Sequence, residues 1–320
     1  MRYQTLLLIV VILVSVTAVK GFGVFANEER TEVLSVAELT QAMPASEKVP
    51  SRSPVLLESS LPAQAGYAEE QVRVRPVHSS DDSCSAVRAS IAYVRDMESG
   101  ALVYNRNISQ RWPIASITKL MSAVIAIEQF DTKEPVTITA AHVERTEGFS
   151  TFSPGTTLTA NDMVRALLIA SSNDAAFALA DHMGEEEFIG RMQAKAQELG
   201  MNQTSFYEPS GLSFLNQSTA SDLYLLMRYI HHTHPYLLDS TRQKTVTVWD
   251  SGQGKQKTVA NINQFAGRSD FLGGKTGFID QSGGNLVAMF KADGKQLFAA
   301  VLGSADRFGE IETLLNCMSE

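Results

Sequence analysis

Near the middle of the chain the sequence reads Pro113-Ile114-Ala115-Ser116-Ile117-Thr118-Lys119-Leu120-Met121, and mostly apolar residues follow as far as Ile127. This pattern predicts a buried helix that begins near Pro113, with Ser116 in its first turn. Residues three apart on a helix lie on one face, so the Lys119 amine can approach the Ser116 hydroxyl. A serine hydroxyl is a weak nucleophile at neutral pH unless a base lies beside it. The spacing therefore predicts a nucleophilic serine, Ser116, with Lys119 as its base.

A lysine acts as a base only when it is partly neutral, so its pKa must fall below the ordinary value. Burial of the amine lowers the pKa, and so does a second positive charge nearby. Lys275, which belongs to a motif described below, is a candidate for that charge. For the Ser116–Lys119 pair taken alone, an ordinary solvated pair at a helix start is the alternative.

A second motif, Ser171-Ser172-Asn173, lies between two helical patterns at 163–170 and 175–182. We expect Ser171 and Asn173 on a short loop between these helices, where polar side chains can face a cleft. The Ser171 hydroxyl can pass a proton to a leaving amine, and the Asn173 amide can hold a peptide group. For these residues taken alone, a helix cap is the alternative.

A third motif, Lys275-Thr276-Gly277, has apolar residues on both sides, and a second apolar run follows at 286–290. The pattern predicts a β-hairpin. Lys275 and Thr276 are expected to offer a charge and a hydroxyl to a carboxylate, while Gly277 allows another backbone or a ligand to come close. The main-chain N–H of Phe278, together with that of Ser116, is expected to form an oxyanion hole. A solvated lysine on an edge hairpin is the alternative.

Taken in this order, the three motifs resemble those of the low-molecular-mass penicillin-binding proteins, the serine D-alanyl-D-alanine peptidases. The resemblance covers about residues 86–315, and it also rests on four shorter matches, at 154–158, 168–173, 210–212 and 218–223. It implies the α+β fold of β-lactamases and penicillin-binding transpeptidases and an active site that needs no cofactor. It also implies peptidoglycan stem peptides and cross-bridges as substrates, and β-lactam antibiotics as acylating partners.

One residue of the second motif resembles a particular branch of this family. Many members carry glycine where this chain has Ser172, and serine there resembles the endopeptidase branch named after penicillin-binding protein seven. That branch also lacks an additional C-terminal β domain, and we expect none in this chain. The resemblance implies an endopeptidase that cleaves D-alanyl cross-bridges, with a D-alanyl-D-alanine carboxypeptidase as the alternative.

Two further functions fit the sequence less well. A sensor that binds β-lactams without turnover would need a signalling domain or several membrane spans, and neither pattern is visible. A β-lactamase of class A would need an E-x-x-L-N loop, and the nearest candidate, Glu208, is followed by Pro209-Ser210-Gly211 instead.

The N-terminal part differs in composition from the rest. Residues 1–26 contain Arg2, an apolar run from Leu6 to Val19 and the cleavage pattern Val24-Phe25-Ala26, which predict a cleaved signal peptide and export to the periplasm. An uncleaved anchor, with membrane association, is the alternative. Residues 27–83 hold five of the ten prolines and predict a disordered linker. Residues 84–320 then form the serine D,D-peptidase catalytic domain. The formal net charge of −8 argues against nucleic acid as a partner.

Within the catalytic domain, strand patterns stand at both ends and helical patterns occupy the middle, 113–234. This arrangement predicts an antiparallel five-stranded sheet with helices on both faces and an inserted helical region. The expected strands of the sheet are 91–96, 102–105, 271–278, 286–291 and 297–302, with a separate hairpin at 243–259 and a last helix at 307–318.

Histidines and cysteines leave two questions. His231, His232 and His234 stand beside a proline at the end of a helical pattern, so we favour a frayed helix end over a metal site and predict no metal. Cys84 and Cys317 mark the two ends of the domain. In an oxidising compartment they can pair, and otherwise they remain as buried thiols.

Overall fold

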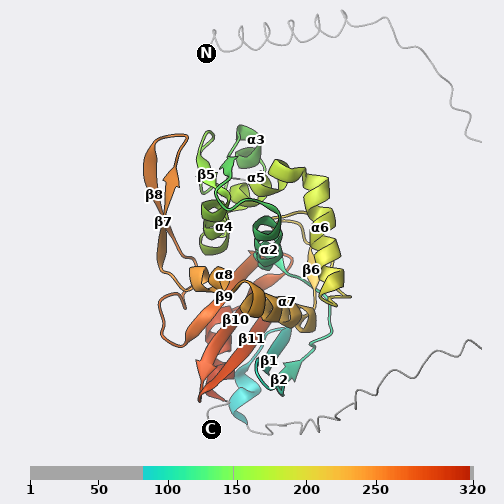
Figure 1. Cartoon of the computed structure of the whole chain (residues 1–320). Coiled ribbons are helices and arrows are strands. Elements are labelled where there is room, and N and C mark those ends of the chain that lie inside the picture. Colours follow the sequence, from blue (N-terminus) through green and yellow to red (C-terminus); the bar gives the residue numbers. More distant parts are fainter. Residues whose placement is uncertain (1–81, 147, 318–320) are drawn as a thin grey trace, which may run out of the picture. The chain divides into compact units, whose positions relative to one another are not determined.

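A five-stranded antiparallel sheet crosses the molecule, with strand order β2-β1-β11-β10-β9 (Figure 1). The computed structural model describes residues 82–146 and 148–317. The sheet consists of β1 (Ile91–Asp96), β2 (Leu102–Arg106), β9 (Phe271–Ile279), β10 (Gly283–Ala292) and β11 (Lys295–Ser304). Strand β1 pairs with β11, so the two ends of the domain meet inside the sheet. The predicted five-stranded sheet is confirmed.

Helices and three small strand pairs make up the remainder. The short pairs are β3 (Trp112–Pro113) with β6 (Gln217–Ser218), β4 (Pro135–Thr137) with β5 (Thr157–Thr159), and β7 (Thr245–Asp250) with β8 (Lys255–Ala260). The helices are η1 (Asp82–Ala86), η2 (Ala115–Thr118), α2 (Lys119–Gln129), α3 (Ala140–Glu144), α4 (Ala160–Ile169), α5 (Asn173–Met183), α6 (Glu185–Glu198), α7 (Ala220–Thr233), α8 (Pro235–Thr241) and α9 (Arg307–Asn316).

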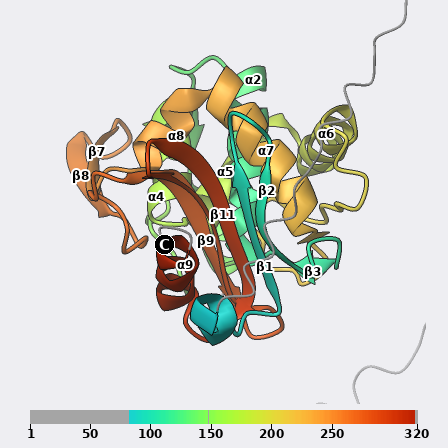
Figure 2. The ribbon, with the colours of Figure 1, turned by 90° about the horizontal axis from the view of Figure 1, so that it is seen from below.

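Strands β10 and β11 supply side chains to two separate cores, because successive residues of a strand point to opposite faces. Val287 and Met289 belong to the core shared with the helical region, whereas Leu286 and Ala288 belong to the core closed by α9. Figure 2 shows α9 on one side of the sheet and α7 and α8 on the other. The near-continuous burial of β10 follows from this two-sided packing. The prediction of helices on both faces is confirmed.

The start of the helix that carries the nucleophile differs from the sequence prediction. Pro113 does not open a helix; it lies in β3 and pairs with Gln217. Ala115 follows with a left-handed φ of 49°, and Ser116 lies in the 3₁₀ turn η2, which leads directly into α2. A left-handed alanine costs on the order of 1–3 kcal/mol, which tight packing around the turn has to offset. The nucleophile segment is therefore a sharp turn from strand to helix.

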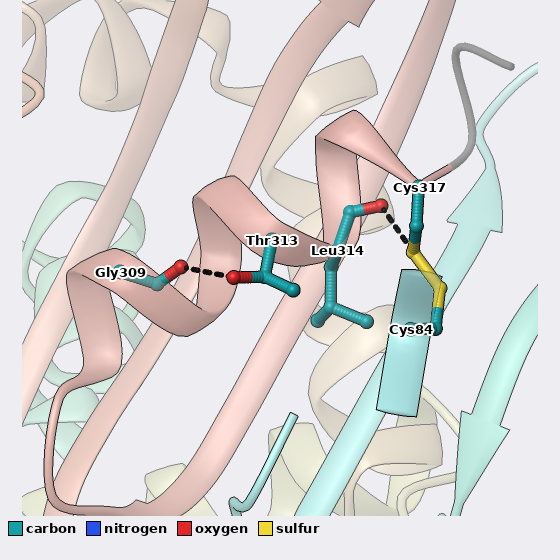
Figure 3. Close-up of a disulfide and its surroundings, with 5 residues drawn as sticks. All are labelled: Cys84, Gly309, Thr313, Leu314 and Cys317. Carbon is teal, nitrogen blue, oxygen red and sulfur yellow. Dashed lines mark hydrogen bonds between the residues drawn. A yellow bond between two sulfur atoms is a disulfide. The ribbon is translucent and has the colours of Figure 1, made fainter. Parts of the chain in front are cut away.

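Cys84 and Cys317 form a disulfide, with their Cα atoms 5.6 Å apart (Figure 3). The bond joins η1 to the end of α9, across a sequence separation of 233 residues. The Cys317 sulfur also lies 3.4 Å from the carbonyl oxygen of Leu314. Of the two alternatives that the sequence leaves open, the structure has the disulfide.

Several expectations concern residues that the structure does not describe. The signal segment, 1–26, and the linker as far as residue 81 lie outside the described residues. Among the helices described between 82 and 317, with Glu147 left out, none is both long enough and apolar enough for a membrane span.

Candidate active site

Lys119 and Ser116 lie side by side at the junction of η2 and α2. The Lys119 Nζ atom is 2.9 Å from Ser116 Oγ, as the three-residue spacing predicts. The Lys119 side chain has no exposed surface. It also donates to Asn173 Oδ1 at 2.7 Å and to the carbonyl oxygen of Ser210. Three segments that are distant in sequence thus converge on one amine.

These contacts suit a lysine that acts as a base. A neutral amine has two N–H bonds and one lone pair. The oxygens of Asn173 and Ser210 accept hydrogen bonds from the two N–H groups. The lone pair therefore remains to accept a hydrogen bond from the Ser116 hydroxyl. In this form the Ser116 hydroxyl donates to Lys119, which is the starting arrangement for proton transfer.

Burial lowers the pKa of Lys119 to about 7, from an ordinary value of 10.5. The negative charges of Glu208 and Asp174 act in the opposite direction and keep the pKa from falling further. Of the two causes that the sequence leaves open, burial and the charge of Lys275, burial is the main one for Lys119. Near neutral pH a large fraction of Lys119 is therefore free to accept a proton.

Lys275 reaches the second motif across the site. Its Nζ atom donates to Ser171 Oγ at 2.9 Å and to the carbonyl oxygen of Thr276, also at 2.9 Å. Burial and the charges of Lys119 and Arg307 hold the pKa of Lys275 well below its ordinary value. Lys275 is 1% exposed and Thr276 2%, so neither is a solvated surface residue. Their predicted contact with a substrate carboxylate stays a prediction.

The second motif lies at a helix start, as one of its two interpretations predicts. Ser171 is on the loop with a left-handed φ of 57°, whereas Asn173 is already the first residue of α5. Ser172 is the N-cap, and its side chain accepts from the Ala175 main-chain N–H at 3.3 Å. The expectation that Asn173 lies on the loop is therefore wrong, because α5 begins at Asn173. As the first residue of α5, Asn173 lies beside Lys119.

Strand β9 packs directly against the nucleophile turn, and Gly277 makes this possible. A Cβ atom on Gly277 would lie 2.7 Å from the Ile114 carbonyl oxygen and 3.2 Å from the Ser116 nitrogen. Gly211 has the same role on the other side, since a Cβ there would collide with the Ala115 carbonyl. Glycine at both positions lets three backbones approach one another around Ser116.

A cleft of about 530 Å³ opens over Ser116, Ser171 and Asn173. Its other walls come from three segments: Phe149, the pair Gly211 and Leu212, and the run 278–281. Phe278, which is expected to contribute an N–H to the oxyanion hole, lines this cleft and has a side chain that is 61% exposed. Lys119, Lys275 and Thr276 lie beneath the cleft rather than on its surface.

Sequence reasoning missed several residues that hold the site together. Arg307 donates to the Gly277 carbonyl oxygen at 2.8 Å, and Asn285 donates to the Pro113 carbonyl oxygen at 2.9 Å. Ser210 is quoted in the resemblance, yet its carbonyl contact with Lys119 is a main-chain interaction that no side-chain pattern reports. The Asn285 contact joins β10 to the segment that precedes Ser116, and the Arg307 contact joins α9 to β9.

Glu208 organises the loop that carries Ser210. Its carboxylate accepts from the main-chain N–H groups of Ser210 and Gly211 and from the Asn216 side chain, at 2.7, 2.5 and 2.7 Å. The carboxylate therefore serves its own loop. Gly211 and Leu212, rather than Glu208, form the cleft wall there.

The three histidines considered as metal ligands lie at the end of α7 and just after it. His234 follows the end of α7 and lies 2.9 Å from Glu128. Within residues 82–146 and 148–317 no group of three or more histidine, cysteine, aspartate or glutamate side chains is arranged to hold a metal ion.

The sequence matches a known protein family. The model of peptidase family S11, described as D-alanyl-D-alanine carboxypeptidase, matches residues 77–306. The chain is 35% identical over 204 residues to a D-alanyl-D-alanine endopeptidase of Pseudomonas aeruginosa. That match covers 61% of this chain and 65% of the relative, so the chain spans less than two thirds of the relative's length.

Two solved structures are similar in both fold and sequence. A D-alanyl-D-alanine carboxypeptidase from Mycobacterium tuberculosis has a TM-score of 0.66 and 26% identity, over 72% of this chain and 90% of that one. Penicillin-binding protein D2 from Listeria monocytogenes, in a cefotaxime-bound form, has a TM-score of 0.61 and 28% identity, over 72% and 97%. With the three motifs gathered around one cleft and a family match over most of the described residues, the chain belongs to peptidase family S11, the D-alanyl-D-alanine carboxypeptidase family.

Proposed function

We propose that this protein is a serine D-alanyl-D-alanine endopeptidase, which cleaves D-alanyl cross-bridges of peptidoglycan through an acyl-enzyme on Ser116. One observation carries the proposal: a fully buried Lys119 with a pKa of about 7 lies 2.9 Å from a serine that faces an open cleft. Such a pair can activate the serine without a metal or an organic cofactor.

In the acylation step neutral Lys119 takes the hydroxyl proton while Ser116 Oγ bonds to the D-alanine carbonyl carbon. The main-chain N–H groups of Ser116 and Phe278 then stabilise the negative charge on the carbonyl oxygen. The C–N bond breaks as the leaving amine receives a proton. Ser171 supplies the path for that proton, because it faces the cleft and hydrogen-bonds to Lys275. Water then attacks the ester and releases the serine.

The same residues suit two leaving groups. In a cross-bridge the leaving amine belongs to a diamino acid whose D-configured carbon carries a carboxylate, so it resembles a terminal D-alanine. Lys275 and Thr276 can therefore serve an endopeptidase and a carboxypeptidase alike. The name of the Pseudomonas relative and the serine at position 172 favour the endopeptidase. The description of the family and the name of the mycobacterial neighbour favour the alternative, a D-alanyl-D-alanine carboxypeptidase.

Inhibition by β-lactams and a periplasmic location are part of the proposal. A β-lactam carries a strained amide that Ser116 can open to give a stable ester, and a cefotaxime-bound neighbour supports this step. The N-terminal apolar segment supports export, with tethering to the membrane if it is retained.

The test is to incubate the protein with purified peptidoglycan fragments and to identify the products by mass. We expect cross-linked dimers to disappear faster than pentapeptide monomers lose D-alanine, and Ser116→Ala to stop both reactions. The reverse ranking would favour the carboxypeptidase. Penicillin labelling without any cleavage would instead favour a sensor.

A further inference from the structure

Asp174, next to the second motif, is a carboxylate with no exposed surface, and none of the steps above uses it. Its Oδ2 atom accepts from Ser150 Oγ at 2.8 Å and from the main-chain N–H groups of Thr151 and Phe152 at 3.0 and 2.6 Å. Its Oδ1 atom accepts from Ser172 Oγ and from the Ala175 main-chain N–H. One buried side chain therefore joins the start of α5 to the loop at 149–153, which we call the Phe149 loop.

The Phe149 loop is held from a second side by the β7–β8 hairpin. Lys257 of β8 donates to the Thr151 carbonyl oxygen at 2.5 Å, and its ammonium lies 4.5 Å from the centre of the Phe152 ring. Burial lowers the pKa of Lys257, and the negative charge of Asp174 opposes this shift. The base of the loop is thus fixed by one acidic and one basic side chain, while Phe152 is buried between them.

The first residue of the loop is exposed. The Phe149 side chain is 80% exposed and lines the active-site cleft together with Phe278. Because the loop is anchored at its base, the apolar surface of this ring is removed from water when a ligand covers it. Phe278 comes from β9 and Phe149 from the Phe149 loop, so the two rings belong to different walls.

We propose that Phe149 contacts the aliphatic part of the bound stem peptide, and that Asp174 and Ser172 are positioning residues that hold Phe149 there. This inference rests on the proposed function, because it concerns the same substrate. Alanine methyl groups and the methylene chain of a diamino acid are the parts of a stem peptide that an aromatic wall can cover. Ser172 acts through Asp174, and Asp174 acts through the main chain of the Phe149 loop.

Hydrogen exchange tests the positioning directly. Ser172→Ala should speed exchange of the Thr151 and Phe152 amides severalfold. Asp174→Asn should do so at least tenfold, because an amide has one acceptor oxygen and cannot accept both from the Phe149 loop and from the donors at the start of α5. Ser172→Ala also removes a helix cap, so the matched control is Thr159→Ala, which removes the cap of α4. Thr159→Ala should leave exchange in the Phe149 loop unchanged.

Kinetics test the contact with substrate. For the muropeptide that the wild type cleaves fastest, Phe149→Ala should raise KM about tenfold, equivalent to about 1.4 kcal/mol, with kcat within about twofold. Phe214→Ala, which truncates an exposed aromatic side chain outside the cleft lining, should change KM by less than about twofold. Ser172→Ala should raise KM severalfold alone and add nothing further in the Phe149→Ala background.

The outcomes separate this inference from the proposed function. Unchanged exchange in both Ser172→Ala and Asp174→Asn would overturn the positioning role, as would additive effects of Ser172→Ala and Phe149→Ala on KM. If Asp174→Asn does not fold, Ser172→Ala decides the question. A wild type that cleaves no muropeptide would sink the proposed function and with it the substrate contact, whereas the exchange data would still decide the role of Asp174.

Discussion

Lys275 Nζ donates to Ser171 Oγ at 2.9 Å, although the two residues lie 104 positions apart in the sequence. The contact joins the strand motif to the loop motif and places a buried amine next to the hydroxyl on the predicted proton path. The same lysine lies close enough to Lys119 for the two charges to oppose each other. Two buried amines therefore lie beneath one cleft: Lys119 contacts Ser116 as its base, and Lys275 donates to Ser171.

The first prediction concerns the nucleophile. Ser116→Ala should abolish labelling by a fluorescent penicillin while the circular dichroism spectrum stays that of the wild type. Lys119→Ala should be nearly as severe, and combining the two should add nothing, because nucleophile and base act as a unit. Replacement of the exposed Lys133 by alanine is the control and should label normally. Persistent labelling of Ser116→Ala would contradict the assignment.

The second prediction concerns Lys275. Lys275→Gln should raise the activation free energy of acylation by about 2–4 kcal/mol, the effect of losing a charge-assisted partner in a buried site. Lys291→Gln, which removes an exposed lysine from the neighbouring strand, is the matched control. Stopped-flow acylation by a β-lactam measures both variants. Equal rates in wild type and Lys275→Gln would remove Lys275 from the reaction.

The third prediction is the pH dependence. Lys119 is a base only when neutral, so the second-order acylation rate constant should rise with pH through about 7 and level off above it. The direction follows from burial, which destabilises the protonated form and lowers the pKa. Rate constants measured between about pH 6 and pH 8 test this. A rate that falls with rising pH would rule out a neutral amine as base.

The fourth prediction concerns Gly277. Gly277→Ala should slow acylation by at least about a hundredfold, because the new Cβ would press against the Ile114 carbonyl and displace the Ser116 turn. Gly190→Ala in α6 is the control, since its Cβ would meet open space. Penicillin labelling compares the two. Normal labelling of Gly277→Ala would show that β9 and the nucleophile turn are not so closely fitted.

The fifth prediction concerns the disulfide. A thiol titration of the denatured, unreduced protein should find no free thiol, because Cys84 and Cys317 are joined. Reduction, or Cys84→Ser with Cys317→Ser, should destabilise the fold by up to about 5 kcal/mol, as expected for a bridge that closes a long loop. Thermal unfolding measures the loss. Two reactive thiols in the unreduced protein would contradict the bond.

The sequence alone determined the features that depend on local spacing. The Ser116–Lys119 contact follows from a three-residue step on a helical turn, and the β9–β10 hairpin follows from two apolar runs around a glycine-rich motif. The five strands of the sheet were predicted for the same reason, because alternating or continuous apolar residues report strand burial directly. The order of the motifs was sufficient to indicate the family.

Only the tertiary structure decided what depends on segments that lie far apart in the chain. It showed that burial is the main cause of the low pKa of Lys119, because desolvation depends on everything packed around the amine. It joined Cys84 to Cys317, which spacing leaves open. It also placed Asp174 beneath the Phe149 loop, since a buried carboxylate takes whichever N–H groups the fold brings to it.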